Sequence, residues 1–587
     1  MTQREPGSGP HILTIALEDY YQLGAFNRLI QRGEWYRFES RLARNTRRAL
    51  DLVEGAGHRA TFFVLGWVAD TMPELVAEVA ARGHEIASKG YYHRSVRGMT
   101  PSEFREDLAR AREALQRASG QRVLGYRVAD GWFAPEDLWA LNVLTEEGYE
   151  YDSSIGPLGR QFASEPWRRF AHTHQFGDRS LWEFPISAVE LLGWMVPIAG
   201  GNWLRQLPPA LVRRAVRHWH QTYTAPYVMY FHAWELDPDQ PKISAAPWLQ
   251  RVRTYRNIDQ MPGRLGYFFE RYRFTSIAEH LGLAVQRPGV ARVPFQPAAK
   301  AEAALEAAAH TAVAWTGEGP AHGGSGERLP LTVVIPCFNE ELILPYLANT
   351  LRNVWIRLSD RYDLNWLFVD DASTDGTWEA LGRIFGRRAD CRLVRHERNL
   401  GVAGAMRTGL EHATTEIVAS IDCDCTYDPL LLGEMVPLLT PETDLVVASP
   451  YHPLGTVRNV PEWRLVLSRT LSGMYRRVLH HKLATYTSCF RVYRRSIVRQ
   501  IPIRDTRFLG VAELVGRLDL AGGRIVEFPT TLQVRMLGRS KMKILHTILG
   551  HLGLLARLAW ARLRHTVPPL VRAGAPVPRR SGEVSRV

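Results

Sequence analysis

The chain has 587 residues and a formal net charge of +13, with 45% hydrophobic and 23% charged residues. Single cores stop growing at roughly 250 to 300 residues, so this length predicts two large domains. The composition is ordinary for globular proteins and excludes wholesale disorder. All five cysteines lie in the second half, and their odd number argues against a disulfide framework and favours a reducing cytoplasm.

The N-terminal segment 1–10 is polar and has no apolar centre, so we do not expect it to act as a secretory signal. No uncharged apolar run of the roughly twenty residues that span a bilayer follows anywhere in the chain. Both observations predict a protein of the cytoplasm.

Residues 8–285 are expected to form the first domain. Strand-like runs at 11–17, 60–65 and 85–88 alternate with helical stretches. The helical stretches lie around 42–55, 73–82 and 102–118. Such alternation predicts an α/β fold, either a βα barrel or a sheet.

Four motifs in this domain carry a resemblance to a known family. They occupy 18–22 (EDYYQ), 60–67 (ATFFVLGW), 83–88 (GHEIAS) and 230–238 (YFHAWELDP). Here the sequence resembles the polysaccharide deacetylases of the NodB type, in particular the subset associated with exopolysaccharide loci. The resemblance implies a deformed βα barrel. It also implies an aspartate that acts as base and an Asp-His-His set that holds a metal to activate water.

The chain departs from that family at the positions that matter most. Ala16 stands where the family has its first aspartate, Lys89 replaces one metal histidine, and 127–130 reads Arg-Val-Ala-Asp in place of Arg-Ala-Pro. An ammonium group repels a dication and offers no lone pair while protonated. We therefore expect that deacetylation is lost and that this domain holds no metal. The residues of the degenerate site are Ala16, Glu18, Asp19, Lys89, His93, Arg127 and His232, and they still provide a possible sugar-binding groove.

Residues 286–329 are expected to form a linker. The segment contains three prolines, an alanine-rich stretch and a glycine-rich end. This composition is typical of a short helix with flexible ends, and we expect no chemistry there.

Residues 330–545 are expected to form the second domain. The apolar run 331–335 predicts a strand, a second strand at 366–369 precedes the polar loop 370–377, and a third at 417–421 ends in Asp422-Cys423-Asp424. Alternating strands and helices imply a parallel sheet whose ligand lies at the carboxyl ends of the strands. The polar loops are therefore expected to converge on one crevice.

The segments 334–340, 370–377 and 422–424 together resemble the family-2 glycosyltransferases, which bind a nucleotide-sugar on a sheet of the type called GT-A. Further segments, 488–495, 527–529 and 535–541, resemble the subgroup that charges polyprenyl phosphates, such as dolichol-phosphate mannose synthase. This second resemblance implies a lipid-phosphate acceptor, although a glycan acceptor stays open.

The resemblance assigns roles to individual residues. Asp422 and Asp424 are expected to hold a divalent cation, Mg²⁺ or Mn²⁺, which neutralises charge on the departing diphosphate. Glu513 is the base that we nominate if the acceptor is a hydroxyl group, and it is otherwise an ordinary helix-surface acid. The expected nucleotide-sugar contacts are Pro336, Asn339, Glu340, Asp370, Asp371, Ser373, Asp375, Arg535, Arg539 and Lys541. The last three are basic, and either contact phosphate or form a solvated edge.

The C-terminal segment 546–587 is expected to be a basic amphipathic tail. From 541 onwards, nine Lys or Arg accompany one acid, and apolar positions 544, 548, 552, 555 and 559 keep helical spacing. Such a helix suits an anionic membrane interface, and it equally suits packing on the transferase domain. We expect no nucleic-acid partner.

These features predict a glycosyltransferase that moves a sugar from a nucleotide-sugar to a lipid-phosphate or glycan acceptor. It would work at the inner membrane face in the assembly of cell-surface polysaccharide or glycolipid, with a silent deacetylase-like domain. One alternative is a bifunctional deacetylase and glycosyltransferase. Another is a first domain that serves only as a glycan-binding or scaffolding module.

Overall fold

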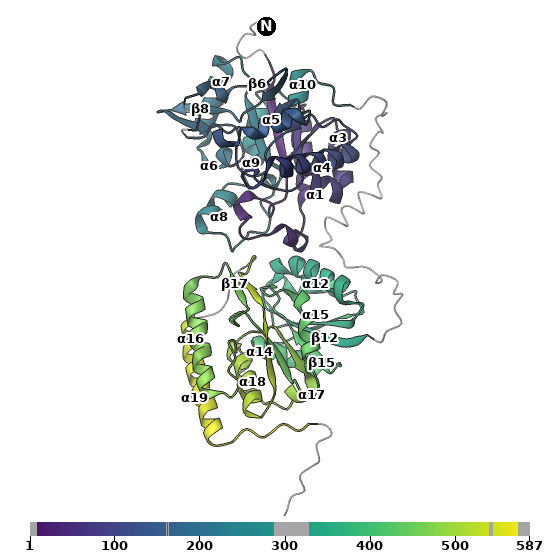
Figure 1. The fold of residues 1–587 in the computed structure, drawn as a ribbon, viewed down its shortest axis with the longest axis vertical. Helices are drawn as coiled ribbons and strands as arrows, with labels where there is room; N and C mark the ends of the chain where they lie inside the picture. The colour runs from purple at the N-terminus through teal and green to yellow at the C-terminus, as the bar shows by residue number, and fades with distance from the viewer. Residues whose placement is uncertain (1–8, 160, 163, 287–327, 539–543, 573–587) are drawn as a thin grey trace, which may run out of the picture. The chain divides into compact units, whose positions relative to one another are not determined.

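The structure is a computed structural model that describes residues 9–286 except 160 and 163, then 328–538 and 544–572. The chain forms two compact units, Met1–Trp35 with Ser40–His310, and Tyr36–Glu39 with Thr311–Val587 (Figure 1). Each unit has its own central sheet and its own hydrophobic core.

The sheet of the first unit is a curved, mostly parallel array, as the predicted deformed βα barrel requires. Among its pairings, only that of β6 with β7 is antiparallel. Its strand order is β10 (Val228–His232), β1 (His11–Leu17), β2 (Thr61–Val64), β3 (Glu85–Ser88), β4 (Gly125–Tyr126), β5 (Tyr151–Asp152), β7 (Arg179–Glu183) and β6 (His172–Phe176), with β11 (Phe274–Thr275) beside β1.

Helices cover this sheet, and the three predicted helical stretches correspond to α1, α3 and α4. The longest, α4, begins with a capping box between Thr100 and Glu103 and ends at Gly120, whose φ of 69° suits glycine. The helices are α1 (Leu42–Gly55), α2 (Gly66–Thr71), α3 (Pro73–Ala81), α4 (Pro101–Ser119), α5 (Trp139–Glu146), α6 (Asn202–Gln206), α7 (Pro209–Thr222), α8 (Trp248–Tyr255), α9 (Met261–Phe269) and α10 (Ile277–Leu281). The hairpin β8 (Ala188–Leu191) and β9 (Trp194–Pro197) lies outside the sheet.

Both faces of this sheet are buried. Alternate residues of a strand point to opposite faces, so Leu13, Ile15 and Leu17 of β1 join the large core, whereas Ile12 joins a smaller cluster with Phe63 of β2. Continuous apolar strands of this kind are typical of parallel sheets covered on both sides.

The second unit has a seven-stranded mixed sheet with the GT-A arrangement. Strand β12 pairs in parallel with β13 and β15, whereas β18 is antiparallel to both β15 and β16. The order is β14 (Cys391–Arg395), β13 (Tyr362–Asp370), β12 (Leu329–Cys337), β15 (Ile417–Ser420), β18 (Arg491–Arg494), β16 (Leu445–Ser449) and β19 (Ile525–Pro529).

The predicted strands at 331–335, 366–369 and 417–421 correspond to β12, β13 and β15. Helices surround the sheet, and a small two-stranded sheet, β17 (Thr456–Arg458) with β20 (Thr531–Gln533), stands apart. The helices are α12 (Leu344–Leu358), α13 (Thr377–Phe385), α14 (Val402–His412), α15 (Leu432–Met435), α16 (Glu462–Val478), α17 (Arg495–Val498), α18 (Phe508–Leu520) and α19 (Ile544–Leu563).

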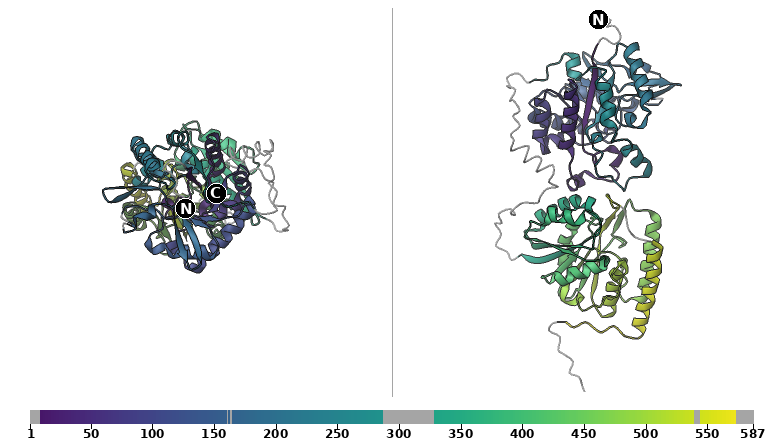
Figure 2. Two further views of the ribbon diagram at one scale, coloured as in Figure 1. Left: turned by 90° about the horizontal axis from the view of Figure 1, so that it is seen from above. Right: turned by 180° about the vertical axis from the view of Figure 1, so that it is seen from behind.

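Helix α19 runs alongside α16 at one edge of this unit (Figures 1 and 2). Its buried stripe consists of His551, Leu554, Leu555 and Leu558, and His551 Nδ1 lies 2.8 Å from the Tyr475 hydroxyl of α16. This stripe is rotated from the predicted one, because Leu552 is exposed. One face of the helix therefore packs as a core helix, while another face is left to solvent.

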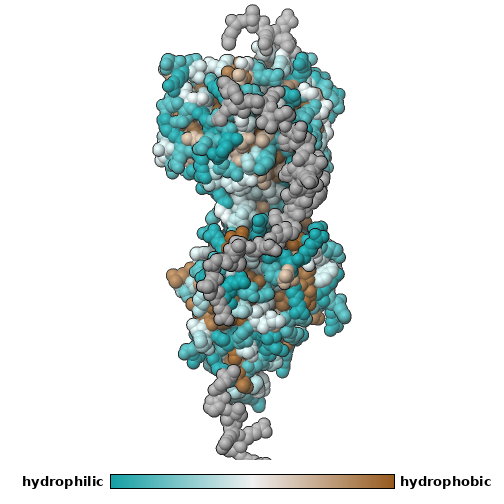
Figure 3. Space-filling view, turned by 90° about the vertical axis from the view of Figure 1, so that its right-hand side faces the viewer, coloured by the Kyte–Doolittle hydropathy of each residue, from teal (hydrophilic) through white to brown (hydrophobic). Residues whose placement is uncertain are grey.

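The side of the molecule in Figure 3 is largely hydrophilic, with brown patches on the second unit. Within the described ranges, no helix combines the length and the apolar character needed to cross a membrane.

Candidate functional site

The carboxyl ends of three neighbouring strands of the second unit lie in one row. Cys337 of β12 is the register partner of Asp370 of β13, which is the partner of Arg395 of β14. The polar loops that follow these strands therefore emerge at one edge of the sheet, as the sequence predicts.

A cavity of about 470 Å³ opens at this edge. Arg395 borders it together with Ala372, Ser373, His396 and Glu397. The Arg395 Nε lies 3.2 Å from Asp370 Oδ2, and Nη2 donates to the Ser373 carbonyl at 3.3 Å. Sequence reasoning missed Arg395, although its place at the end of the third parallel strand was a usable signal.

Asp371 has a structural role here. Its carboxylate accepts hydrogen bonds from the backbone N–H groups of Leu400 and Gly401, both at 2.7 Å, and lies 2.8 Å from His396 Nδ1. With both oxygens occupied, this side chain holds the segment before α14 and shapes the cavity wall. The neighbouring Asp370, rather than Asp371, is the register partner of Arg395 and contacts its guanidinium.

The loop after β12 is tied to the loop after β13. Asn339, which has a positive φ of 53°, accepts a hydrogen bond from Thr374 N at 2.7 Å, and Asn339 N donates to Ser373 Oγ at 2.9 Å. Asp375 Oδ1 accepts from Thr377 N at 3.0 Å. These contacts bring together the predicted residues of the two loops, with the half-buried Pro336 at the end of β12.

The paired carboxylates follow β15. The backbone turns at Cys425, whose φ is 52°, and Thr426 N donates to Asp424 Oδ1 at 3.1 Å. Desolvation, reinforced by the charge of Asp424, raises the pKa of Asp422 to about 7. A divalent cation would relieve this repulsion and displace the proton, so the two residues fit such an ion by their chemistry.

Arg535 lies beside these acidic residues. Its guanidinium forms an ion pair with Glu340 and lies 3.6 Å from Asp424 Oδ2, while Nε donates to the Leu537 carbonyl at 2.8 Å. A guanidinium in this position is suited to diphosphate oxygens. Arg539 and Lys541, the other two predicted basic contacts, lie outside the described residues.

Glu513, the residue nominated as a base, lies in α18 with its carboxylate fully hydrogen-bonded. Its side chain is fully buried, Oε2 accepts from the N–H groups of Arg504 and Asp505, and Oε1 accepts from Arg517 Nε at 2.7 Å. A carboxylate with both oxygens bound to neighbours holds a loop and is not available to an acceptor hydroxyl.

The degenerate site of the first unit is built around Glu18. The Lys89 ammonium forms an ion pair with this carboxylate, His93 Nε2 lies 3.1 Å from Oε2, and His232 Nδ1 lies 2.6 Å from Oε1. Burial alone would raise the pKa of Glu18, but Lys89 and His232 outweigh it and hold the pKa well below its ordinary value. Lys89 thus places its ammonium group against the same carboxylate that His93 and His232 contact.

The other residues of that site point elsewhere. Asp19 accepts hydrogen bonds from Ser40 Oγ and Arg41 N, both at 2.8 Å, and burial raises its pKa to about 6. Arg127 donates to Ser153 and Thr14, and burial lowers its pKa to about 10. Ala16 is the register partner of His232 on β10 and has no polar group to offer.

The described residues of the two units do not present a complete metal-ligand set. Among the residues that the structure describes, no three or more His, Cys, Asp or Glu side chains are grouped so that they could hold a metal ion. In the second unit the protein would supply two carboxylates, and oxygen ligands from a bound diphosphate would have to complete the shell.

Comparisons with known proteins agree with this division. The family model "Glycosyl transferase family 2" matches residues 332–502, and "Polysaccharide deacetylase" matches 35–151. A third model, described as a domain of unknown function, matches 153–282.

Curated relatives match part of the chain. The chain is 30% identical to the polyprenol monophosphomannose synthase of Mycolicibacterium smegmatis, over 38% of this chain and 85% of that protein. It is 29% identical to the dodecaprenyl-phosphate galacturonate synthase of Rhizobium johnstonii, over 40% and 69%. It is 30% identical to the undecaprenyl-phosphate mannosyltransferase of Micrococcus luteus, over 36% and 86%.

Solved structures give weaker likenesses. A CE4 family pseudoenzyme from Bacillus anthracis matches at 12% identity with a TM-score of 0.25, over 46% of this chain and 63% of that one. A mannosyltransferase from Pyrobaculum calidifontis, in complex with GDP-Man and Mn²⁺, matches at 21% identity with a TM-score of 0.28, over 46% and 73%.

Fold and site together define a GT-A glycosyltransferase fused to a polysaccharide deacetylase-like domain. The match to the mycobacterial relative, at 30% identity over 85% of its length, establishes the family of the chain. The chain belongs to glycosyl transferase family 2.

Proposed function

We propose that the chain transfers a sugar from a nucleotide-sugar to a polyprenyl phosphate, in the assembly of cell-surface polysaccharide or glycolipid. One observation carries this proposal above others. Arg535 forms an ion pair with Glu340 and lies 3.6 Å from Asp424 Oδ2, and the two acids follow strands β12 and β15 of the sheet at whose edge the cavity opens. Relatives whose names specify polyprenyl-phosphate acceptors support the choice of acceptor.

The chemistry follows from the residues. The cavity at Arg395 would take the nucleoside, and Asp422 and Asp424 would hold Mg²⁺ or Mn²⁺. When bound, that ion would supply charge neutralisation at the departing diphosphate. Arg535 would donate hydrogen bonds to the same phosphates. A phosphate acceptor is already anionic and needs no strong base, which is consistent with the buried, fully bonded state of Glu513.

The acceptor lipid implies contact with a membrane surface. The solvent-facing stripes of α16 and α19 carry large apolar side chains, with exposed arginines beside them. An apolar stripe flanked by basic residues suits the anionic inner leaflet. We propose that these two helices place the second unit there as a peripheral protein. The exposed apolar residues are Trp463, Val466, Leu467, Met474, Leu549, Leu552, Trp560 and Leu563.

For the first unit we propose a glycan-binding or scaffolding role without deacetylation. Ala16 removes the base that the family resemblance implies, and Lys89 neutralises Glu18. The bifunctional alternative would need both a metal and a base at this site, so the side chains around Glu18 favour a silent domain.

Transfer can be tested with a panel of nucleotide-sugars, undecaprenyl phosphate and Mn²⁺ or Mg²⁺, by following nucleotide release and a lipid-linked product. We expect one donor to give both. Asp422→Asn or Asp424→Asn removes a charge while keeping the size, and should lower turnover at least about a hundredfold, given the several kcal/mol that a bound metal contributes. The exposed Asp363→Asn serves as a matched control and should leave turnover unchanged.

Near-normal activity of either variant, or full activity in excess chelator, would contradict the metal assignment. A product that stays water-soluble and grows into a long polymer would contradict the lipid-phosphate acceptor.

A further inference from the structure

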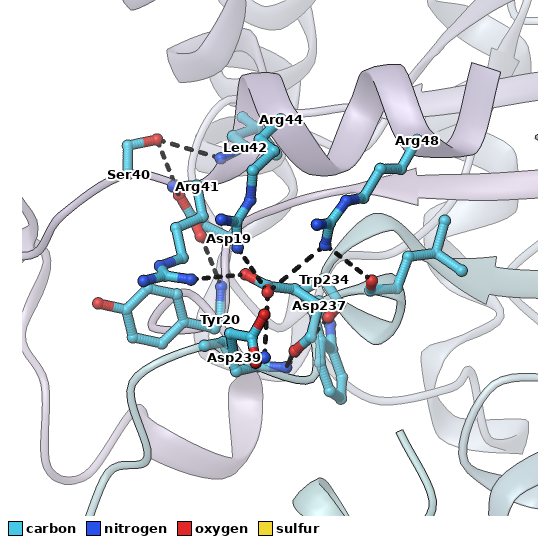
Figure 4. A network of polar contacts seen from close by, with 12 residues as sticks. Asp19, Tyr20, Ser40, Arg41, Leu42, Arg44, Arg48, Trp234, Asp237 and Asp239 are labelled. Carbon is cyan, nitrogen blue, oxygen red and sulfur yellow. Dashed lines mark hydrogen bonds and ion pairs between the residues drawn. The ribbon is translucent and has the colours of Figure 1, made fainter. Parts of the chain in front are cut away.

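Three arginines of the first unit surround one carboxylate (Figure 4). Arg41 precedes α1, and Arg44 and Arg48 lie within it, so their spacing of three and four residues places them on one face of the helix. Asp237 follows β10 and the short helical turn Ala233–Leu236. We call Arg41, Arg44 and Arg48 the arginine cluster.

The contacts with Asp237 are asymmetric. Arg44 Nη2 lies 2.6 Å from Oδ1, Arg41 Nη1 lies 3.2 Å from Oδ2, and Asp239 N also donates to Oδ1 at 3.2 Å. Arg48 Nη1 is 3.6 Å from Oδ1, beyond hydrogen-bond reach, and donates instead to the Leu236 carbonyl at 3.2 Å. One carboxylate therefore serves mainly two of the three guanidinium groups.

The guanidinium groups of Arg44 and Arg48 carry more N–H donors than their contacts with Asp237 and the Leu236 carbonyl use. A guanidinium has five N–H donors and no acceptor, and a carboxylate has two oxygens. The Asp237 side chain is fully buried, whereas those of Arg44 and Arg48 are 34% and 42% exposed. The guanidinium groups of Arg44 and Arg48 thus reach solvent while the Asp237 carboxylate is buried beneath them, and the exposed Asp239 lies beside them.

The arginine cluster borders the degenerate site. Asp19 receives hydrogen bonds from Ser40 and the backbone of Arg41, and the next residue back, Glu18, is the centre of the Lys89 and histidine contacts. Both Glu18 and Asp237 follow adjacent parallel strands, β1 and β10, at their carboxyl ends. That edge is where ligands of βα folds bind.

We propose that the arginine cluster binds an oxyanion, a carboxylate or a phosphate ester, carried by a glycan. The inference rests on the proposed glycan-binding role of the first unit and narrows its ligand to an acidic saccharide. Guanidinium groups match the planar geometry of carboxylate and phosphate and often bind them through two hydrogen bonds.

A purely structural role makes a different prediction. If the arginine cluster only fastens α1 to the segment after β10, removing Arg48 changes little, and removing Arg44 lowers the stability of the unit without affecting any ligand. Binding measurements on both variants therefore separate the two roles.

The test uses the full chain and tetragalacturonate, with its methyl ester as a neutral ligand of the same backbone, in isothermal titration calorimetry. We expect the acid to bind more tightly than the ester, and its affinity to fall as salt is added. Arg44→Gln and Arg48→Gln should each weaken binding of the acid about tenfold, as loss of a hydrogen bond to a charged group implies. Inorganic phosphate that competes would show that phosphate esters are accepted, and a lack of competition would restrict the site to carboxylates.

Arg47→Gln is the matched control. Arg47 lies on the same helix, but its guanidinium is engaged by Glu78, with Nε 3.1 Å and Nη2 3.0 Å from Oε2. Arg47→Gln should change the affinity for the acid by less than about twofold. This is smaller than the change expected when a hydrogen bond to a charged group is lost. Thermal melting of each variant identifies any loss of folding.

Equal affinity for acid and ester would overturn the inference while leaving the glycan-binding role intact. Absence of binding by either ligand would overturn both. An equal loss in Arg47→Gln and Arg48→Gln would show that the anion binds elsewhere, and would likewise overturn the assignment.

Discussion

At the scale of single residues, the two units use buried carboxylates in opposite ways. Glu18 is kept ionised by Lys89 and His232, so its negative charge is already neutralised. Burial and the charge of Asp424 raise the pKa of Asp422 to about 7, so a bound cation would stabilise the ionised form of this carboxyl group. The neighbours of each carboxyl group therefore decide its state: it is already paired with a cationic side chain in the first unit and suited to a metal cation in the second.

A third buried pair predicts how the first unit responds to pH. Asp152 of β5 is the register partner of Glu183 of β7, and both are fully buried. Burial raises the pKa of Asp152, and burial together with the charge of Asp152 raises the pKa of Glu183 well above its ordinary value. The folded unit therefore retains a proton that the unfolded chain releases.

The sign of the pH dependence follows from the link between proton binding and folding. A raised folded pKa contributes stability that is present below the ordinary carboxylate pKa and is lost as the pH rises through the folded value. We expect the contribution of this pair to the free energy of unfolding to fall with rising pH, by at most about 1.4 kcal/mol per pH unit for one proton. Glu183→Gln should flatten this dependence, and the exposed Glu150→Gln should not. Denaturant midpoints between pH 5 and 8 measure it, and an unchanged slope in Glu183→Gln would refute the shared proton.

At the scale of elements, α19 has one buried stripe and one exposed apolar face. Its stripe at His551, Leu554 and Leu558 packs into the unit, while Leu549 and Trp560 are 61% and 59% exposed. Exposed large apolar side chains gathered on neighbouring helices indicate an interaction surface.

This surface gives a prediction for membrane binding. Leu549→Asp with Trp560→Asp adds charge to the proposed membrane face without touching the packed stripe. We expect at least about a tenfold loss of co-sedimentation with vesicles of anionic lipid, because apolar area is lost and each new acid is repelled by the surface. Ile356→Asp on α12, which replaces a 54% exposed apolar residue, is the matched control. Failure of the unchanged protein to bind vesicles, or an equal loss in the control, would rule the face out.

At the scale of the whole molecule, each unit carries its own core and its own candidate site, so we expect their activities to be separable. The unchanged chain should release no acetate from an N-acetylated glycan. Ala16→Asp with Lys89→His restores a carboxylate and a neutral nitrogen ligand, and should allow zinc to bind to the first unit.

The double variant should leave sugar transfer unchanged. Metal content after dialysis and acetate release measure the first effect, and product formation on polyprenyl phosphate measures the second. Metal-dependent acetate release by the unchanged chain would contradict the silent-domain proposal and favour a bifunctional enzyme.

Much of the fold could be predicted from local patterns. The apolar runs at 11–17 and 331–335 correspond to β1 and β12. Short apolar runs that contain β-branched residues and end in polar residues favour strands that are buried on both faces of a parallel sheet. The order of strand and loop also placed Asp370 and the segment 422–424 at one edge, since parallel strands share a carboxyl end.

Only the tertiary structure decided what each polar side chain touches. Asp371 and Glu513 look available in the sequence, yet backbone N–H groups and an arginine occupy their oxygens. Glu18, not Asp19, meets Lys89, which is 71 residues away along the chain. Local periodicity predicts which face of an element is buried, but the direction of a side chain beyond the end of a strand depends on distant partners. Those contacts, rather than the motifs, distinguish the site of the second unit, whose paired carboxylates suit a cation, from the site of the first unit, where Lys89 neutralises Glu18.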